Sequence, residues 1–401
     1  MNTNYVGMIV ADLHIGAINP SIQYNEFKSI FLDRIEDIKP DYIIFLGDYF
    51  DHKASLNDEL SYYSFYIFDE LISRIKENNL STKIRFVYGT ESHEWDQYNI
   101  INIANKRGLD VSIIHTVTEE ELFPDFNVLY IPEEHIYNKS EYYKDYLNNT
   151  KKYDYIFGHG IIREVMREAA ISNESSTNNR KKVPIFNTGE LMYACKGQVY
   201  FGHYHINTNI NDEVFYVGSF NRWCFGEEED KGFYKIETNR IEYSNEFIVN
   251  NLTPTYKTIS FGYDNKIFQD TEIMENKLKQ IDNMVKDKIF DNVRFEFNIP
   301  PNVENPEYIM NFIKERYRFN KRIKTNIVHG YIEDKKKKDK EEIDKWNVEN
   351  APLFNKDLSI EDKISFFISL EFKRELSPEK INLYINNNLS DIIRLYNENN
   401  Y

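Results

Sequence analysis

Five short motifs rich in histidine and aspartate are the part of this sequence that could do chemistry. They are Asp12-Leu13-His14, Gly47-Asp48-Tyr49-Phe50-Asp51, Ser92-His93-Glu94, Gly158-His159 and Gly202-His203-Tyr204-His205. Imidazole and carboxylate groups together form the donor set of transition-metal and zinc sites in proteins. Two such ions held side by side activate a water molecule and neutralise the oxygens of a phosphate group. The motifs therefore predict a hydrolytic centre with two metal ions.

The spacing of the motifs suggests how their side chains would share two ions. Asp48 directly follows an apolar run and is the natural bridging carboxylate. Asp12 and His14 are two residues apart, so both side chains can point to the same side and reach one ion. His203 and His205 have the same spacing and could each serve a different ion, and His159 completes the set.

His93 has a position suited to a different role. It follows its own apolar run, where it could act as a general acid or stabilise charge on the leaving oxygen. His52, beside Asp51, could line the site but is more simply read as exposed. The mixed ligand set favours Mn²⁺, Fe²⁺ or Zn²⁺ over Mg²⁺ and Ca²⁺, which prefer oxygen ligands. A single histidine or Gly-Asp-x-x-Asp motif would be weak evidence, so the prediction depends on all five motifs occurring together.

Apolar runs precede all five motifs and predict the buried strands that would position them. The runs cover residues 5–10, 42–46, 84–88, 153–157 and 198–201. Open α/β sheets bind ligands at the carboxyl edge of their strands, which is where the polar residues after each run would gather. Apolar residues at helical spacing predict helices over 23–38 and 56–76. The aromatic residues of the second helix are expected to pack on the sheet and not to stack on bases: Tyr62, Tyr63, Phe65, Tyr66 and Phe68.

The pattern changes after the last histidine motif. Short runs over 214–218, 232–237 and 240–248 predict strands that form a meander on the far side of a sandwich. A further unit is expected from about residue 255, with helices over 272–288 and 306–317 and strands over 293–299 and within 322–331. Four lysines then open a charged stretch, and helical periodicity returns over 359–396. We therefore predict domains over 1–250 and 255–333, a linker over 334–350 and a helical tail over 351–401 that docks on its own protein or a partner.

Composition limits the class of protein. A chain of 401 residues with 41% apolar and 15% aromatic residues has material for two or three packed domains and does not have the composition of a disordered protein. No apolar run approaches the ~20 residues that span a bilayer, and the N-terminus does not resemble a signal peptide. The two cysteines, Cys195 and Cys224, have no metal-ligand spacing. A cytoplasmic protein with reduced thiols and no membrane association is expected.

The charge is unevenly distributed along the chain. Residues 1–250 contain 24 Lys and Arg against 39 Asp and Glu, a balance of −15 out of a net charge of −16. A protein that binds nucleic acid unaided normally shows a basic footprint, which this region lacks. Bound divalent ions would offset part of the negative charge. The acidic surface could equally serve solubility alone.

Taken together, the motifs resemble the signature of the calcineurin-like metallophosphoesterase superfamily, which reads Asp-x-His, Gly-Asp-x-x-Asp, Gly-Asn-His-Asp/Glu, Gly-His and Gly-His-x-His. More narrowly, the chain resembles SbcD-type nuclease subunits, including phage-encoded versions. Tyr216-Val217-Gly218-Ser219 and an acidic turn between Gly226 and Gly232 follow the last motif, as in that branch. The resemblance implies an α/β fold, a metallophosphoesterase-type β-sandwich flanked by helices. A small α+β capping domain and a helical tail would follow it.

The resemblance also implies a role for each motif residue. One ion would be held by four residues: Asp12, His14, Asp48 and His205. The second ion would be held by Asp48, His159, His203 and the asparagine of the family motif. His93 would be the catalytic histidine, and Asp51 would be a carboxylate that supports the ligands around it.

This sequence departs from the family motif at the asparagine. It reads Gly89-Thr90-Glu91-Ser92-His93-Glu94, so that Ser92 stands before the histidine and the turn is two residues longer. A serine hydroxyl is a weaker ligand than an amide oxygen. Ser92, the Glu91 carboxylate or a water molecule could fill the position.

The activity implied by the resemblance is manganese-dependent hydrolysis of DNA phosphodiesters at duplex ends, hairpins or single strands, in DNA repair or recombination. The partners would be a second copy of the chain and an SbcC-type ATPase subunit, in the cytoplasm of a bacterium or of a phage host. A phosphatase or phosphodiesterase acting on nucleotides or proteins is the main alternative, and the acidic first region favours it. A non-catalytic scaffold is a further alternative, although the retained motif residues argue against it.

Overall fold

The computed structural model describes residues 4–55, 57–94, 97–98, 101, 107–148, 150–165, 182–261, 270–286, 291–299, 306–318 and 323–329. They form two compact units, of which the larger takes most described residues up to Thr258 and the smaller most of those from Ile259 onward. The predicted linker over 334–350 and tail over 351–401 lie outside the described residues, and the domain limits given above stay a prediction. Within the described part, no helix is both long and apolar enough to cross a membrane.

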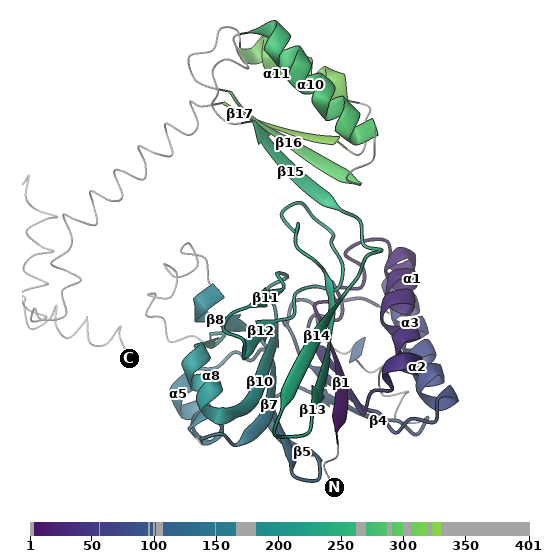
Figure 1. Cartoon of the computed structure of the whole chain (residues 1–401), viewed down its shortest axis with the longest axis vertical. Helices are drawn as coiled ribbons and strands as arrows, with labels where there is room; N and C mark the ends of the chain where they lie inside the picture. Colours follow the sequence, from purple (N-terminus) through teal and green to yellow (C-terminus); the bar gives the residue numbers. More distant parts are fainter. Residues whose placement is uncertain are drawn as a thin grey trace, which may run out of the picture. The chain divides into compact units, whose positions relative to one another are not determined.

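Two six-stranded sheets form the framework of the larger unit (Figure 1). The first has the order β14-β13-β1-β2-β3-β4 and the second the order β11-β12-β10-β7-β6-β5. The strands of the first sheet are β1 (Tyr5–Ala11), β2 (Tyr42–Leu46), β3 (Lys83–Val87), β4 (Asp110–Ile114), β13 (Gly232–Thr238) and β14 (Tyr243–Val249). Those of the second are β5 (Thr118–Phe123), β6 (Phe126–Ile131), β7 (Tyr153–His159), β10 (Cys195–Gly202), β11 (Thr208–Asn209) and β12 (Val214–Tyr216).

Helices cover the outer face of each sheet. On the first sheet lie α1 (Pro20–Ile30), η1 (Leu32–Arg34), α2 (Ile35–Ile38) and α3 (Glu59–Glu77). On the second lie α6 (Lys144–Leu147) and α8 (Thr188–Ala194), with α5 (Lys139–Tyr142) just before α6. The short elements β8 (Ile161–Ile162), η3 (Arg163–Val165) and β9 (Ile185–Phe186) complete this unit.

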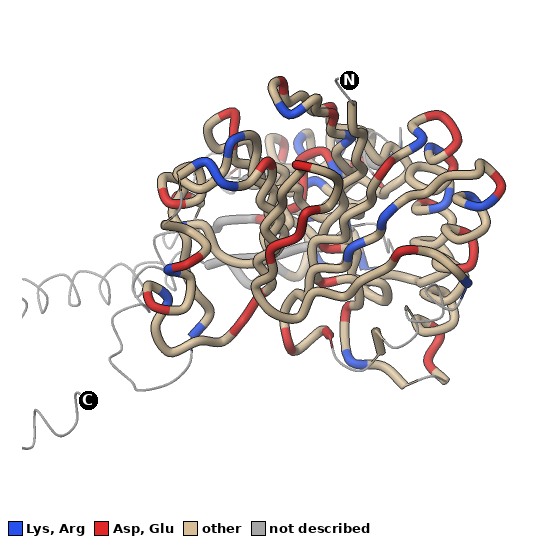
Figure 2. Tube along the Cα trace, turned by 90° about the horizontal axis from the view of Figure 1, so that it is seen from below, with Lys and Arg blue, Asp and Glu red and all other residues tan. Residues whose placement is uncertain are grey.

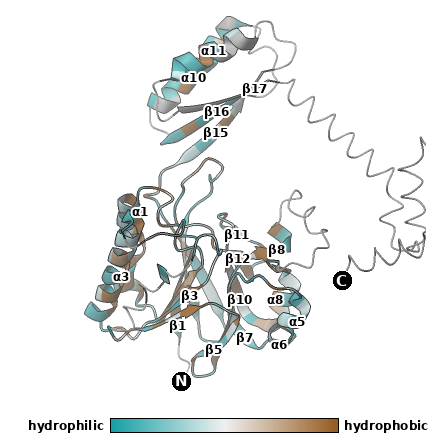
Figure 3. Ribbon diagram, turned by 180° about the vertical axis from the view of Figure 1, so that it is seen from behind, coloured by the Kyte–Doolittle hydropathy of each residue, from teal (hydrophilic) through white to brown (hydrophobic). Residues whose placement is uncertain are grey.

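Side chains of the central strands alternate between two buried layers. In β1, Met8 and Val10 pack with the helices, whereas Ile9 and Ala11 pack between the two sheets. The layer between the sheets is rich in aromatic rings from the second sheet, including Phe157 and Tyr200. Figure 3 shows hydrophobic residues on the strands of both sheets. Since strands buried on both faces read as continuous apolar runs, this arrangement explains the pattern of the sequence. The predicted fold class, a β-sandwich flanked by helices, is confirmed.

The three strands after the last histidine motif do not form one meander, so that prediction is wrong. Strand β12 joins the second sheet, parallel to β10, whereas β13 joins the first sheet and pairs antiparallel with β1. Strand β14 continues the first sheet from β13. Short strands separated by turns do not reveal which sheet edge each will occupy, because that choice depends on contacts distant in sequence.

The predicted helices of the first sheet also need correction. The helix expected over 23–38 is interrupted at Phe31 and continues as η1 and α2. In α3, Phe68 is buried, but Tyr62, Phe65 and Tyr66 are 55%, 38% and 39% exposed. A helix buries one stripe of its surface, and consecutive aromatic residues pass around the helix and out of that stripe. The prediction that these three side chains pack on the sheet is therefore wrong.

The smaller unit contains a three-stranded sheet of order β15-β16-β17. The elements that belong to it wholly or in part are β15 (Tyr256–Phe261), α10 (Thr271–Lys286), β16 (Asn292–Ile299), α11 (Pro306–Tyr317) and β17 (Ile323–His329). The boundaries between the two units fall inside β15, α10 and β16. Arg316 joins the two helices through hydrogen bonds to Asp282 at 2.6 Å and to Glu275 at 3.3 Å. The predicted order of helices and strands is confirmed.

Candidate metal centre

All five motifs lie at the carboxyl ends of parallel strands. Asp12 and His14 follow β1, Asp48 follows β2, and the turn that contains His93 follows β3. Strands β1, β2 and β3 are parallel neighbours in the first sheet. In the second sheet, His159 ends β7, and its parallel neighbour β10 leads into His203 and His205. Both sheets thus deliver polar side chains to one region, as the sequence predicts.

Several of these residues have a strained backbone. Asp12, His14 and Asp48 have φ angles of 47°, 42° and 47°, and His203 has a φ of 103°. L-residues seldom adopt such angles, which cost about 1–3 kcal/mol each when the surrounding structure imposes them. Hydrogen bonds hold the strained turns together: His14 N donates to Asp48 O at 2.9 Å, and His203 N donates to Asp12 Oδ1 at 3.0 Å. These hydrogen bonds keep the residues at the ends of different strands close to one another.

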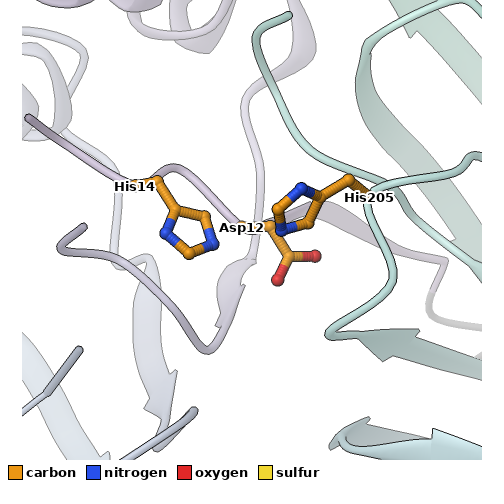
Figure 4. Close-up of side chains that lie close together, drawn as sticks. All are labelled: Asp12, His14 and His205. Atoms are coloured by element: carbon orange, nitrogen blue, oxygen red, sulfur yellow. The ribbon is translucent and has the colours of Figure 1, made fainter. Parts of the chain in front are cut away.

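Asp12, His14 and His205 form the first cluster, with one ligand atom of each within 4.8 Å of the others (Figure 4). The carboxylate and the two rings come from the ends of β1 and β10. His205 uses its Nδ1 in a 3.1 Å hydrogen bond with Glu227, which fixes the ring and leaves Nε2 for the cluster. Burial lowers the pKa of His205, but the hydrogen bond with Glu227 and the charge of Asp12 outweigh burial and raise it.

Asp48, His159 and His203 form the second cluster under the same distance limit. His159 is 1% exposed, and its Nδ1 hydrogen bonds to Leu46 O at 2.8 Å. Its other ring nitrogen, Nε2, lies 3.4 Å from Asp48 Oδ2. The ring is thus oriented by the backbone so that Nε2 faces the carboxylate.

Asp48 lies between the two clusters. Its Oδ2 is 3.5 Å from His14 Nε2 and 3.4 Å from His159 Nε2. Burial raises the pKa of Asp48, but the neighbouring His159 and His14 outweigh it and lower the pKa well below the ordinary value. Thr90 N also donates to Asp48 Oδ1 at 2.6 Å. An ionised carboxylate flanked by one imidazole from each cluster has the position expected of a bridging ligand.

Buried nitrogen atoms without hydrogen-bond partners provide the test of whether metal ions fit here. They are Nδ1 and Nε2 of His14, Nε2 of His159 and Nδ1 of His203. A buried polar atom left unsatisfied costs about 1–3 kcal/mol, and natural proteins seldom leave several together. Imidazole nitrogens beside carboxylates are the donors that Mn²⁺, Fe²⁺ and Zn²⁺ accept. The donor set and its unsatisfied atoms fit two divalent ions.

His93 and Asp51 lie beside the first cluster. They form a third group with His14, in which His14 Nδ1 is 3.6 Å from Asp51 Oδ1. His93 Nδ1 is hydrogen bonded to the backbone oxygen of Asp51. The rings of His93 and His14 pack edge to face, with 4.8 Å between their centroids. His93 therefore has its Nε2 available, while Asp51 supports His14. The side chain of His52 is 56% exposed and contacts Asp51. Of the two alternatives predicted for His52, the structure shows the exposed one.

The turn before His93 places its side chains differently from the sequence expectation. Glu91 and Ser92 are exposed. Thr90, directly after Gly89, instead reaches Asp48, with its Oγ1 at 3.2 Å from Asp48 Oδ2. The structure thus turns Ser92 toward solvent, and its role as a ligand stays an untested prediction.

Three buried carboxylates lie near the clusters but were not predicted as site residues from the sequence. Glu94 is 0% exposed and accepts hydrogen bonds from Tyr49 N, Gly89 N and Tyr98, which ties the turn to β2. Burial is the main cause that raises the pKa of Glu94 to about 8. Glu227 orients His205, and Glu133 lies beside the second cluster. The sequence did carry a signal for Glu133, since it follows another apolar run, residues 126–131.

Comparisons with known proteins add little to these observations. No family model matches the sequence, and no curated protein matches it. Among solved structures, a dimetal phosphatase from Danio rerio is similar with a TM-score of 0.30 and 9% sequence identity, over 61% of this chain and 99% of that chain. A likeness at that level supports neither a fold nor a function for this chain, so both rest on its own topology and side chains.

Proposed function

We propose that this chain is a metal-dependent phosphoesterase with two divalent ions at the carboxyl edge of its sheets. The observation that carries the proposal is Asp48, placed between buried His14 and His159 nitrogens that lack hydrogen-bond partners. Two ions bound here would polarise phosphate oxygens and supply hydroxide at neutral pH. The hydrogen-bonded turns would hold the ligands in place before any ion arrives, which is the preorganisation that such catalysis requires.

The protein's own groups would then handle the leaving oxygen. The hydrogen bond from His93 Nδ1 to the Asp51 backbone oxygen fixes the orientation of the ring. In its protonated form, His93 can donate from Nε2 to the oxygen that leaves phosphorus, which is the role of a general acid. The Asp51 carboxylate lies beside His14 and would help to orient that ring.

We further propose that the substrate is DNA and that the chain is a nuclease subunit. The support is the resemblance of the motifs to SbcD-type nucleases and the presence of an α+β unit after Ile259, which a small-molecule phosphatase does not need. Manganese, a second copy of the chain and an SbcC-type ATPase belong to this proposal. Because acidic residues are spread over the larger unit (Figure 2), DNA binding would depend on bound cations or on the partner.

The test is digestion of an end-labelled DNA duplex in Mn²⁺ by the protein and its His93→Ala variant, with and without the candidate ATPase. We expect the variant to lose at least roughly 100-fold in rate, the usual contribution of a general acid, while it keeps its bound metal. Equal rates of cleavage by the two proteins would contradict the proposed role of His93 as a general acid. Metal content measured on the same samples separates lost chemistry from lost ions.

A phosphatase or phosphodiesterase acting on nucleotides is the second candidate. The acidic balance of residues 1–250, with 39 Asp and Glu against 24 Lys and Arg, favours it because DNA is repelled by such a surface. Rapid hydrolysis of a nucleotide ester by a preparation that leaves DNA intact would support this candidate. A preparation that binds two ions and hydrolyses neither substrate would point to a scaffold.

A further inference from the structure

Glu133 lies next to the second cluster, and no sequence motif contains it. It follows β6, whose last residue Ile131 pairs with Gly158, the residue before His159. Its backbone N donates to Tyr88 O at 3.1 Å, so the segment after β6 is fixed beside the end of β3. The Glu133 side chain is 3% exposed. A buried carboxylate thus enters the same region as the motif residues, from a neighbouring strand.

One oxygen of Glu133 meets three groups of the site. Its Oε2 lies 3.1 Å from His203 Nδ1, 3.9 Å from His159 Nε2 and 3.3 Å from Thr90 Oγ1. His159 and His203 are both residues of the second cluster, and these two nitrogens are buried without hydrogen-bond partners. The backbone N of Thr90 donates to Asp48, and the single hydroxyl proton of Thr90 is shared between Asp48 and this oxygen. Glu133 and Asp48 therefore approach the two histidines with Thr90 between the carboxylates.

The geometry of the His203 contact differs from that of an ordinary histidine–carboxylate hydrogen bond. His205 Nδ1 and Glu227 are 3.1 Å apart and are hydrogen bonded. His203 Nδ1 and Glu133 are separated by the same 3.1 Å, yet His203 Nδ1 has no hydrogen-bond partner. The nitrogen and the oxygen are close without pointing at each other. Ligand atoms that share one metal ion have this relationship, because each directs its lone pair at the ion.

We propose that Glu133 is a ligand of the second ion and occupies the position predicted for Ser92. The inference rests on the proposed two-metal centre and adds a residue to it. The second site would then contain Asp48, Glu133, His159 and His203, with a carboxylate where the family motif supplies a neutral amide. The additional negative charge would strengthen binding of a divalent ion, because a carboxylate attracts the ion more strongly than a dipole does.

The test compares Mn²⁺ binding by the wild-type chain, Glu133→Gln and the matched control Ser92→Ala, by equilibrium dialysis with elemental analysis. We expect two ions in the wild type and in Ser92→Ala. Glu133→Gln should keep the first ion and bind the second at least roughly tenfold more weakly, as for the loss of other groups that hold a metal. Glu133→Asp keeps the charge, so its second-site affinity should fall between those of the wild type and Glu133→Gln, and it decides the question if Glu133→Gln does not fold.

Anomalous diffraction from a crystal soaked in Mn²⁺ separates direct ligation from indirect support of His203. We expect a peak at a bonding distance of about 2.2 Å from a Glu133 oxygen. A peak at His203 that lies outside bonding distance of Glu133 would overturn the inference, as would wild-type affinity in Glu133→Gln or loss of the second ion in Ser92→Ala. If the wild-type chain binds no ions, the proposed function fails as well; if it binds two and hydrolyses its substrate, only the role of Glu133 is at stake.

Discussion

Gly47, the residue before Asp48, offers a sharp test of how the centre is held. Its φ is +73°, and a Cβ placed on it would lie 2.3 Å from His159 Nδ1 and 2.8 Å from Gly89 Cα. The substitution Gly47→Ala would therefore force the His159 ring to move, although that ring is held by its hydrogen bond to Leu46 O. We expect loss of the second ion together with loss of stability.

The expected size follows from two separate costs. An alanine in the left-handed region costs about 1–2 kcal/mol. Overpacking a filled interior costs about 1–3 kcal/mol more. Gly108→Ala is the matched control, because Gly108 has a φ of +83° and a Cβ there would meet nothing within 4 Å. That variant should show the backbone cost alone, with normal metal binding.

Urea unfolding in the presence of EDTA measures both variants without the contribution of bound metal, and Mn²⁺ titration of the same samples counts the ions. Gly47→Ala should be less stable than Gly108→Ala by the overpacking cost and should bind one ion. If the two variants unfold at the same urea concentration and both bind two ions, then the approach of Gly47 to His159 does not position the ring.

Two further predictions concern buried carboxylates. Burial raises the pKa of Glu26 against the opposing hydrogen bonds from Asn250 and Asn221. The stabilising protonated form is therefore lost as pH rises from the ordinary value of 4.5 through the raised folded value, and Glu26→Gln should flatten that decline in urea unfolding followed between pH 4 and 7. Glu227→Gln should weaken the first ion by roughly tenfold while the second is unchanged, since its partner His205 would lose a fixed orientation; Mn²⁺ titration showing a weakened second ion instead would contradict this.

The central strands could be predicted because each is buried on both faces. In β2, Ile44 packs in the layer between the two sheets and Phe45 packs in the layer under the helices. The strand therefore appears in the sequence as an unbroken apolar run, and the polar Asp48 marks its end. Strand β5 could not be predicted in this way. Its Glu120 is held by Arg85 of β3, with Arg85 Nη2 at 2.6 Å from Glu120 Oε1, a contact between segments far apart in sequence. The segment is a strand because it pairs with the following strand β6, although its glutamates give it no apolar run.

Some residues of the candidate site could likewise be predicted from the sequence, and others could not. Motif spacing was enough to predict that Asp12, His14 and Asp48 lie close together, because a residue that ends a buried strand is carried to the edge of its sheet. It was not enough for the altered turn, where Ser92 was chosen for standing next to His93, while the backbone places Thr90 on Asp48. Glu133 was missed although it follows an apolar run, because it belongs to none of the histidine motifs and its neighbour His203 is brought to it only by the pairing of β6, β7 and β10.

The left-handed angles at Asp12, His14 and Asp48 have a consequence for how this protein would evolve. Glycine adopts such angles without strain, so replacement at these positions relieves the backbone and also removes a buried charged or polar group. A lineage or library selected only for resistance to heat would accumulate such replacements early. Under the proposed function, stability and catalysis would therefore favour different residues at these positions, and the present side chains would be retained only while hydrolysis is under selection.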